Sequence, residues 1–308
     1  MATEEPAVRQ DTADGAQPPS KPSKLRGWRK WIWGAIALGA VALALTLINN
    51  NFSFHRQSRD QFQAQADLAL DSAIAWIAAN PKTYHHNPSV MYLVSQLEAL
   101  TGDPRLLPVL DDFRGYITPP QEPMDFVWAR IVDPHAPVPQ VTAEEMSRLG
   151  LDAKWVAFGI APRQVELTPD ELASLYSPDR NHWGTRQHQL LGLTIYRHFN
   201  GSQPDMERLI GHLADGVAQD ARYDFRMNDG YIQRTAFVLD AGRPDLVRRR
   251  WVERILDYQN PDGSWNYCWY GWCRGVFEFG FKYNPGHPTV QAAWALAMLK
   301  YRYPQWAE

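Results

Sequence analysis

The most constraining feature of this chain is an apolar run, WIWGAIALGAVALALTLI, at residues 31–48. Its 18 residues include no charged side chain and one hydroxyl side chain, Thr46. As a helix the run would be about 27 Å long, which is just enough to cross the hydrocarbon core of a bilayer. Trp28, Trp31 and Trp33 lie at its N-terminal edge, where their rings favour the membrane interface. We therefore expect a transmembrane anchor at residues 28–50, with the lipid bilayer as its partner.

Basic residues are distributed unequally on the two sides of this run. Two of them, Arg56 and Arg59, follow it closely, whereas five precede it: Lys21, Lys24, Arg26, Arg29 and Lys30. The excess predicts a single-pass protein of the inner (cell) membrane with a cytoplasmic N-terminus and a periplasmic or otherwise extracytoplasmic domain at residues 51–308. A cleaved signal peptide is the alternative, because Ala42-Leu43-Ala44 resembles a cleavage site. The long leader that cleavage would imply favours an uncleaved anchor.

The composition of the N-terminal tail and of the whole chain indicates which kinds of partner are expected. Residues 1–27 are rich in Pro, Ala, Gln, Ser and charge, which predicts a disordered cytoplasmic tail. The formal net charge of the chain is -3, so we do not expect a nucleic-acid partner. Its 13 Trp and 13 Tyr can fill a core or line a groove that stacks on sugar rings. Nothing in the sequence identifies a protein partner.

Three connecting segments of similar composition occur in the region that follows the anchor. They are LTGDPRL (100–106), FNGSQPDM (199–206) and DAGRPDL (240–246). Gly tolerates the conformation that follows a helix, and Pro suits the first position of the next helix. Amphipathic stretches flank these segments, so each one should end one helix and start another. The arginines at 248–250 are read as the solvated face of such a helix rather than as a polyanion site.

The flanking helices recur with a period of about fifty residues, which is typical of helical-hairpin repeats. Only WVAFGI, at 155–160, weakly suggests a strand. Two capping boxes, Thr142 with Glu145 and Thr168 with Glu171, predict short helices within a Pro-rich region. We therefore expect an all-α domain.

A short stretch near the C-terminus resembles a known family. QNPDGSW (259–265), followed by HPTVQAAWALAMLKY (287–301), is similar to the repeat of α/α-toroid proteins, which include squalene–hopene-type cyclases, prenyltransferase subunits, polysaccharide lyases and glycosidases. Gln259, Gly263 and Trp265 match the element that the cyclases repeat. The resemblance implies an α/α toroid, complete or incomplete, in which this element ties an outer helix to the next inner one. The Asp-x-Asp-Asp motif of the cyclases is absent, so terpenoid cyclisation is a remote alternative.

The segment after this element contains the only two cysteines, Cys268 and Cys273. In an oxidising compartment a local disulfide is the expected state, ahead of a redox pair or a zinc site that includes His287. Aromatic residues surround the cysteines and, with Trp265, form a candidate ligand-binding wall for a glycan or a lipid. The wall consists of Trp265, Tyr267, Trp269, Tyr270 and Trp272. The alternative is a buried loop that packs over the end of the domain.

The resemblance also implies that the N-terminal ends of the inner helices converge on one cavity. On this basis the candidate catalytic residues are His182, Asp229, Tyr231 and Arg234. His287 and Gln291 are candidate ligand-binding residues. Gln187 and Gln233, which share a register with Gln291, either ring the cavity or bond neighbouring helices. His182 and Asp229 could instead be helix caps, and His287 a turn residue before Pro288.

These observations favour a membrane-anchored extracytoplasmic domain that binds a cell-envelope glycan, with processing by lyase or hydrolase chemistry as the activity to be tested. The alternative is a non-catalytic membrane-tethered scaffold for a lipid, glycan or protein partner. No Gly-x-Ser-x-Gly motif is present, and no compact ligand motif such as His-Glu-x-x-His occurs. We therefore expect neither a metal nor a cofactor.

Overall fold

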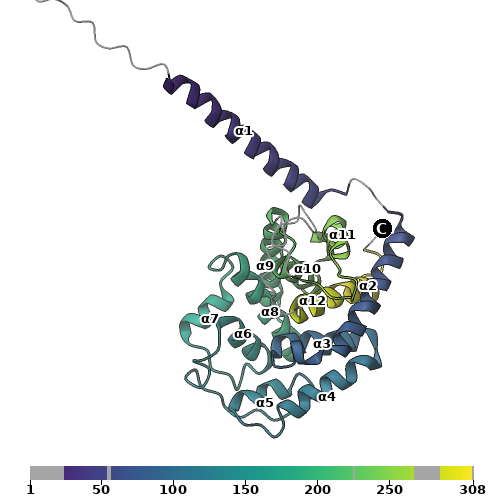
Figure 1. Ribbon diagram of the computed structural model, residues 1–308. Coiled ribbons are helices and arrows are strands. Elements are labelled where there is room, and N and C mark those ends of the chain that lie inside the picture. The colour runs from purple at the N-terminus through teal and green to yellow at the C-terminus, as the bar shows by residue number, and fades with distance from the viewer. Residues whose placement is uncertain (1–23, 54–56, 225, 267–284, 307–308) are drawn as a thin grey trace, which may run out of the picture. The chain divides into compact units, whose positions relative to one another are not determined.

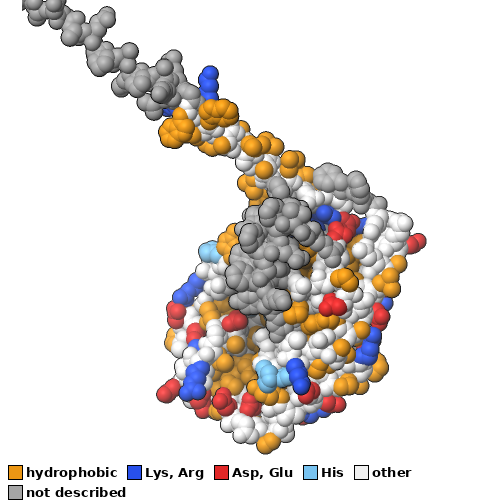
Figure 2. Space-filling view, viewed as in Figure 1, with side chains coloured by type: hydrophobic (Ala, Val, Ile, Leu, Met, Phe, Trp, Pro, Cys, Tyr) orange, Lys and Arg blue, Asp and Glu red, His pale blue; other side chains and the backbone are white. Residues whose placement is uncertain are grey.

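The computed structural model describes residues 24–53, 57–224, 226–266 and 285–306. The chain divides into two compact units, and the boundary follows Leu45 within the first helix. This helix, α1 (Lys24–Asn51), contains an apolar segment, Trp28–Asn51, that is long and apolar enough to cross a membrane. Hydrophobic side chains cover its surface (Figure 2), and Trp31 and Leu38 are largely exposed.

The named secondary-structure elements in the described residues of the second unit are all helices, joined by turns and loops (Figure 1). Its α-helices are α2 (Arg59–Ala79), α3 (Pro88–Thr101), α4 (Leu107–Tyr116), α5 (Pro123–Ala129), α6 (Leu151–Ile160), α7 (Pro169–Tyr176), α8 (Trp183–Asn200), α9 (Pro204–Tyr223), α10 (Asp229–Asp240), α11 (Arg249–Asp257) and α12 (Gly286–Ala297). Three short 3-10 helices, η1 (Pro81–Thr83), η2 (Pro104–Leu106) and η3 (Pro244–Leu246), and a π-helical turn, η4 (Met298–Arg302), complete the set. One isolated parallel bridge joins Val141 and Val165, and no strand occurs in the described part of the chain.

Two helices, α10 and α12, form the centre of this unit. Helix α12 packs against α2, α3 and α10, while α10 also packs against α8 and α9, and α8 against α6. Nearly every residue of α10 and α12 is buried, as expected for helices surrounded by other helices. Helix α9, in contrast, buries one stripe that includes Leu213 and Val217 and leaves a polar face outside. The unit therefore has a row of inner helices, α3, α12, α10, α8 and α6, partly covered by α2 and α9.

The three connecting segments end and start helices as the sequence predicted. Gly102, Gly201 and Gly242 follow α3, α8 and α10 and have φ values of 62°, 80° and 84°. Glycine adopts this left-handed region without the steric cost that a Cβ would bring. Pro104, Pro204 and Pro244 then start the next helical segments.

Two local predictions were wrong. Residues 155–160 are helical rather than extended, because they belong to α6. Thr142 and Glu145 make the bonds of a capping box, with the Thr142 N–H donating to the carboxylate at 2.7 Å, but the chain continues in turns. The equivalent pair at Thr168 and Glu171 does start a helix, α7.

The segment at 259–265 joins three helices. The Gln259 amide donates to the Ala69 carbonyl of α2 at 2.8 Å. The buried Trp265 ring donates to the Ile255 carbonyl near the end of α11, and the Trp265 N–H donates to the Thr289 hydroxyl of α12 at 2.9 Å. This segment therefore ties α2 and α11 to α12.

Candidate functional site

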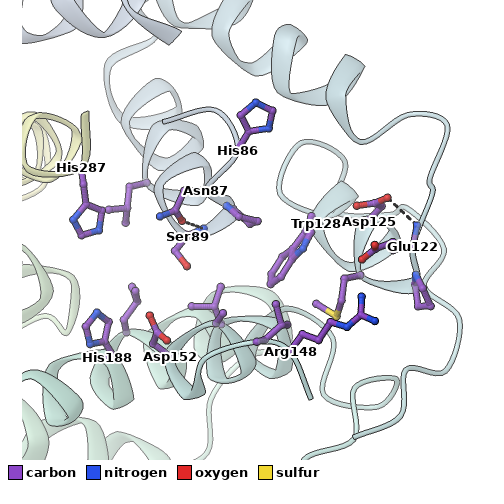
Figure 3. A pocket seen from close by; sticks show the side chains of 18 of the residues that line it. His86, Asn87, Ser89, Glu122, Asp125, Trp128, Arg148, Asp152, His188 and His287 are labelled. Atoms are coloured by element: carbon purple, nitrogen blue, oxygen red, sulfur yellow. Dashed lines mark hydrogen bonds between the residues drawn. The ribbon is translucent and has the colours of Figure 1, made fainter. Parts of the chain in front are cut away.

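A cavity of about 660 Å³ lies among the inner helices of the second unit (Figure 3). Helices α3, α6, α8, α10 and α12 contribute side chains to its lining, among them Ser89, Asp152, His188, Gln233 and His287. Each of these five residues lies in the first two turns of its helix. The N-terminal halves of five helices therefore surround one cavity.

The cavity combines charged, aromatic and apolar surface. In Figure 3, His287, His188 and Asp152 gather toward one end, and Glu122 and Asp125 lie toward the other. Aromatic faces come from Trp128 and Tyr116, and apolar side chains from Leu93, Val156, Leu191 and Phe237. Such a mixture suits a ligand with a polar rim and flat hydrophobic faces.

A histidine and an aspartate from different helices form a short polar contact at this cavity. His287, in the first turn of α12, places its Nδ1 2.6 Å from Oδ1 of Asp229, at the start of α10. Asp229 is buried and does not itself line the cavity, whereas about a third of the His287 side chain is exposed. The carboxylate thus fixes the orientation of the imidazole and leaves Nε2 on the cavity side.

The charges around His287 favour its protonated form. Burial alone would lower the pKa of His287, but the Asp229 charge, its hydrogen bond and the Asp152 charge raise it, and the net pKa is above the usual 6.5. Gln291 lies one turn further along α12, with its Nε2 3.1 Å from His287 Nε2. The buried Gln291 Oε1 has no hydrogen-bond partner among the described residues.

A second histidine is held by a chain of amides. His188 Nδ1 lies 2.7 Å from the Gly184 carbonyl, so Nδ1 carries the proton and Nε2 is the acceptor. Gln233 Nε2 contacts this Nε2 at 3.3 Å, and Gln233 Oε1 accepts a hydrogen bond from Gln187 Nε2. Gln187 Oε1 is buried without a partner among the described residues. Gln233 and Gln291 line the cavity, and Gln187, which does not line it, donates a hydrogen bond to Gln233.

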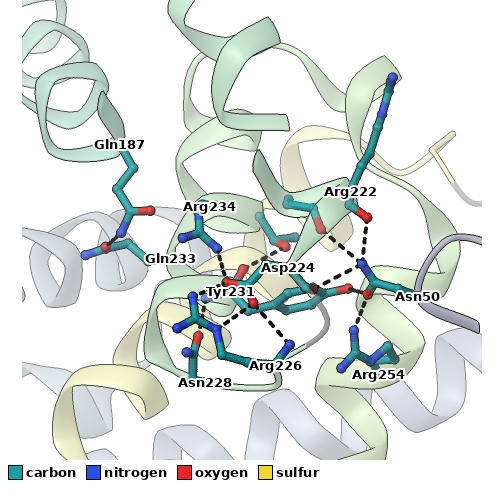
Figure 4. Close-up of polar contacts among 12 residues, drawn as sticks. Asn50, Gln187, Arg222, Asp224, Arg226, Asn228, Tyr231, Gln233, Arg234 and Arg254 are labelled. Atoms are coloured by element: carbon teal, nitrogen blue, oxygen red, sulfur yellow. Dashed lines mark hydrogen bonds and ion pairs between the residues drawn. The ribbon is translucent and has the colours of Figure 1, made fainter. Parts of the chain in front are cut away.

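Tyr231 and Arg234 do not reach this cavity, contrary to expectation. Both belong to a buried cluster (Figure 4), here called the Asn50 network, which consists of Asn50, Asp224, Arg226, Tyr231, Arg234 and Arg254. The Tyr231 hydroxyl donates to Asn50 Oδ1 at 3.0 Å, and burial raises its pKa to about 12. Arg234 pairs with Asp224 at 2.6 Å, and both side chains are almost fully buried. These groups hold the domain together rather than face a ligand.

Asn50 is the centre of this network. It lies in the last turn of α1, within the second unit, and only 1% of its surface is exposed. Its amide Nδ2 lies 3.1 Å from each of three carbonyl oxygens, those of Ala221, Arg222 and Asp224, at the end of α9. Its Oδ1 accepts from Tyr231 and Arg254. Asn50 therefore satisfies carbonyls that a helix end leaves unpaired.

None of the remaining predicted site residues that the structure describes lines the cavity. His182 is exposed, with its Nδ1 3.1 Å from Arg186, and does not line the cavity. Trp265 is 1% exposed and packs between helices instead of facing solvent. The other predicted residues of the aromatic segment lie outside the described residues. They are Tyr267, Cys268, Trp269, Tyr270, Trp272 and Cys273.

Asp152, Trp128 and Tyr116 were not predicted from the sequence. All three come from the Pro-rich region between the recurring helices, where no periodic pattern was found. Among the described residues, no three His, Cys, Asp or Glu side chains are grouped so that they could hold a metal ion. Comparisons with known protein families, curated proteins and solved structures find no match to this chain.

Proposed function

We propose that this chain is a membrane-anchored extracytoplasmic protein that binds a cell-envelope glycan in the cavity and processes it by general acid–base chemistry. One observation carries the proposal: an imidazole oriented by a buried carboxylate opens onto a cavity that also contains a second carboxylate, Asp152. Groups of this kind, poised in a concave site, are the usual components of acid–base catalysis.

The proposed location is supported by α1 and its flanking charges. The segment Trp28–Asn51 has the length and apolar surface of a membrane-spanning helix. The excess of Lys and Arg before it favours a cytoplasmic N-terminus and an extracytoplasmic second unit. A substrate of the cell envelope would be accessible to a domain in this position.

An α/α-toroid-like fold is the second part of the proposal. It is supported by the inner row of helices, whose N-terminal halves surround one cavity, and by the bonds that Gln259 and Trp265 make between neighbouring helices. The helix N-termini also direct positive dipole ends toward the cavity, which partly offsets the charge of its carboxylates. In this fold the cavity is the ordinary ligand site.

In the proposed reaction His287 is the proton donor, because the Asp229 carboxylate raises the pKa of the imidazole and so favours its charged form. Asp229 is a positioning residue that holds Nδ1, and Nε2 delivers the proton to the leaving oxygen of a glycosidic bond. Asp152 is the carboxylate that accepts a proton, either from the attacking water in a hydrolase or from the sugar carbon beside a uronate carboxylate in a lyase. In both cases the glycosidic C–O bond breaks and the departing oxygen takes the His287 proton.

The lining favours a glycan over a terpenoid substrate. Besides Asp152, four carboxylates and one guanidinium face this space: Glu122, Asp125, Glu144, Glu145 and Arg148. Sugar hydroxyls can bond these groups while Trp128 packs against a ring face. A polyprenyl chain would desolvate the same charges without replacing their bonds to water.

The test uses the full-length chain in detergent with a set of envelope oligosaccharides, including uronate-containing ones. Product masses distinguish the reactions, because hydrolysis adds one water whereas elimination adds none and leaves an unsaturated sugar. We expect H287Q and D152N to lower turnover by about 10²–10⁴-fold. H182Q is the matched control, since His182 lies off the cavity, and it should keep wild-type turnover.

A non-catalytic scaffold would give a different result. Oligosaccharide binding that survives H287Q, with no product from the wild-type chain, would contradict the enzyme and leave a glycan-binding domain. Absence of both binding and turnover would contradict the glycan proposal as a whole.

A further inference from the structure

A second hollow, of about 320 Å³, lies at the C-terminal end of α1, and all of its lining residues belong to the second unit. Its lining consists of Leu47, Ile48, Asn51, Phe52, Arg222, Tyr223 and Arg248. The hollow is open to solvent, and Phe52 and Tyr223 are each more than half exposed. It therefore combines two cationic side chains with an apolar and aromatic rim.

The two arginines have no carboxylate partner among the described residues. Arg248 donates to the Asn51 carbonyl at 3.3 Å and lies over the Phe52 ring, with 5.6 Å between its guanidinium carbon and the ring centroid. The Arg222 Nε is buried and makes no hydrogen bond to any described residue. Burial and the charge of Arg222 both lower the pKa of Arg248, so the two cations are close enough to repel each other.

The acidic residues of the surrounding elements are already paired. Asp224 holds Arg226 and Arg234, and Glu253 holds Arg249 and Arg250. The negative end of the α9 dipole compensates Arg222 only in part, because it is equivalent to about half a charge. The two guanidinium groups therefore lack a full counter-charge.

The three arginines at 248–250 therefore differ: two are ion-paired, and one has no carboxylate partner among the described residues. Arg249 and Arg250 form ion pairs on the face of α11, in agreement with the sequence-based interpretation of a solvated helix face. Arg248 precedes α11 and turns to the hollow beside α1. Only this member of the triplet is available to an outside anion.

We propose that the hollow binds the phosphate of an anionic phospholipid head group. The two guanidinium groups supply bidentate donors for phosphate oxygens, and Leu47, Ile48 and Phe52 offer apolar contacts for the adjoining acyl chains. The apolar Trp28–Asn51 segment ends at this hollow, where its helix would leave the bilayer. Basic residues at that level attract anionic lipids. This site rests on the membrane anchoring proposed above but not on the catalytic proposal.

The test is native mass spectrometry of the full-length chain in detergent with equal amounts of phosphatidylglycerol and phosphatidylcholine. The wild-type chain should retain phosphatidylglycerol preferentially, and R222Q and R248Q should each lower that preference by about fivefold. R250Q removes the same charge from a paired arginine and should keep the preference. R248K keeps the charge without the bidentate geometry and should fall between R248Q and the wild type.

Three results would overturn the site: no preference in the wild-type chain, an unchanged preference in the R222Q/R248Q double variant, or an equal loss in R250Q. Inorganic phosphate that displaces the lipid from the wild-type chain would identify free phosphate as the ligand and overturn the lipid assignment. Unchanged thermal unfolding of each variant shows that lost binding is not lost folding. H287Q should retain the lipid, so failure of catalysis and failure of this site are distinguishable.

Discussion

The cavity and the Asn50 network are both built from buried polar side chains, but they differ in how completely those side chains are paired. In the network, Asn50 uses its amide nitrogen and its oxygen, and the Asp224 carboxylate meets two arginines. At the cavity, Gln291 and the supporting Gln187 each leave a buried oxygen without a partner among the described residues. The network leaves one buried donor, Arg234 Nε, without such a partner, whereas Gln291 Oε1 is an unpaired acceptor on a residue that lines the cavity and can meet a ligand.

This difference has an energetic meaning. A largely paired buried cluster is costly to disturb, because removal of one member leaves the others desolvated and unpaired. A partly paired cluster has already lost some of that stabilisation, as is common at functional sites. Substitutions in the network should therefore cost stability, and substitutions in the cavity should cost function.

The largest effect is expected from breaking the charge pair of the network. Asp224→Asn leaves the buried Arg234 without its counter-charge and should lower the free energy of unfolding by about 3–5 kcal/mol. Denaturant unfolding of the full-length chain, followed by tryptophan fluorescence, measures the change. The exposed pair of Arg180 and Asp170 is the control, and Asp170→Asn should cost about 1 kcal/mol or less. Equal losses in the two variants would contradict the importance of burial.

Removal of the central amide should have the next largest effect. Asn50→Leu keeps the approximate volume but leaves the α9 carbonyls and the Tyr231 hydroxyl without their partner, so we expect a loss of about 2–3 kcal/mol. Asn49→Leu, at the exposed neighbouring position, should change stability by about 0.5 kcal/mol or less. A small effect of Asn50→Leu would show that water replaces the amide and that the network is not closed.

The contribution of the His287–Asp229 pair to the stability of the fold should depend on pH. Because the pKa of His287 is raised above its usual 6.5, the pair with Asp229 stabilises the fold fully below that pH and loses its contribution as the pH rises through the raised pKa. Asp229→Asn should cost about 1–2 kcal/mol in mildly acidic solution and less in alkaline solution.

Unfolding of the wild-type chain and of Asp229→Asn across a pH series measures this difference. NMR titration of His287 should show a lower pKa in the variant. A difference in stability that grows as the pH rises would contradict the proposed protonation of His287.

Helix ends were predictable from the sequence because local chemistry determines them. Gly102, Gly201 and Gly242 all adopt positive φ, as their Gly–Pro segments predicted. The predicted helix after Thr142 does not form, because a capping box satisfies the first N–H groups of a helix but does not supply the packing that sustains it. The strand signal at residues 155–160 was misleading, because these residues belong to a helix that is buried on most sides. Such a helix lacks the polar and apolar faces that distinguish an amphipathic helix from a strand in the sequence.

The site was only partly predictable. Asp229 and His287 were both expected near the cavity, but the sequence could not show that they bond each other across 58 positions. Tyr231 lies roughly 200° around α10 from Asp229, since successive helical residues are rotated by about 100°, so helical spacing could have placed it on the opposite face. Asp152 could not be predicted as a cavity residue, because its position depends on how α6 packs against the other helices. The segment that contains α6 has no recognisable repeat.

The most diagnostic comparison is between two glutamines of equal burial, and one of them, Gln291, should give the smallest change in stability. Gln291 and Gln189 are both fully buried, but Gln189 donates to the Leu175 and Ser177 carbonyls and accepts from Asn181. Gln189→Leu should therefore lower the free energy of unfolding by about 2–3 kcal/mol.

Gln291→Leu should change the free energy of unfolding by about 0.5 kcal/mol or less, or even stabilise the chain, because its Oε1 has no partner to lose. The same variant should weaken oligosaccharide binding, since the amide oxygen is then absent from the cavity. Parallel unfolding and binding measurements on the two variants separate a structural amide from a ligand-facing one. If Gln291→Leu destabilises as much as Gln189→Leu, the amide is already paired in the folded chain, and the cavity is as closed as the Asn50 network.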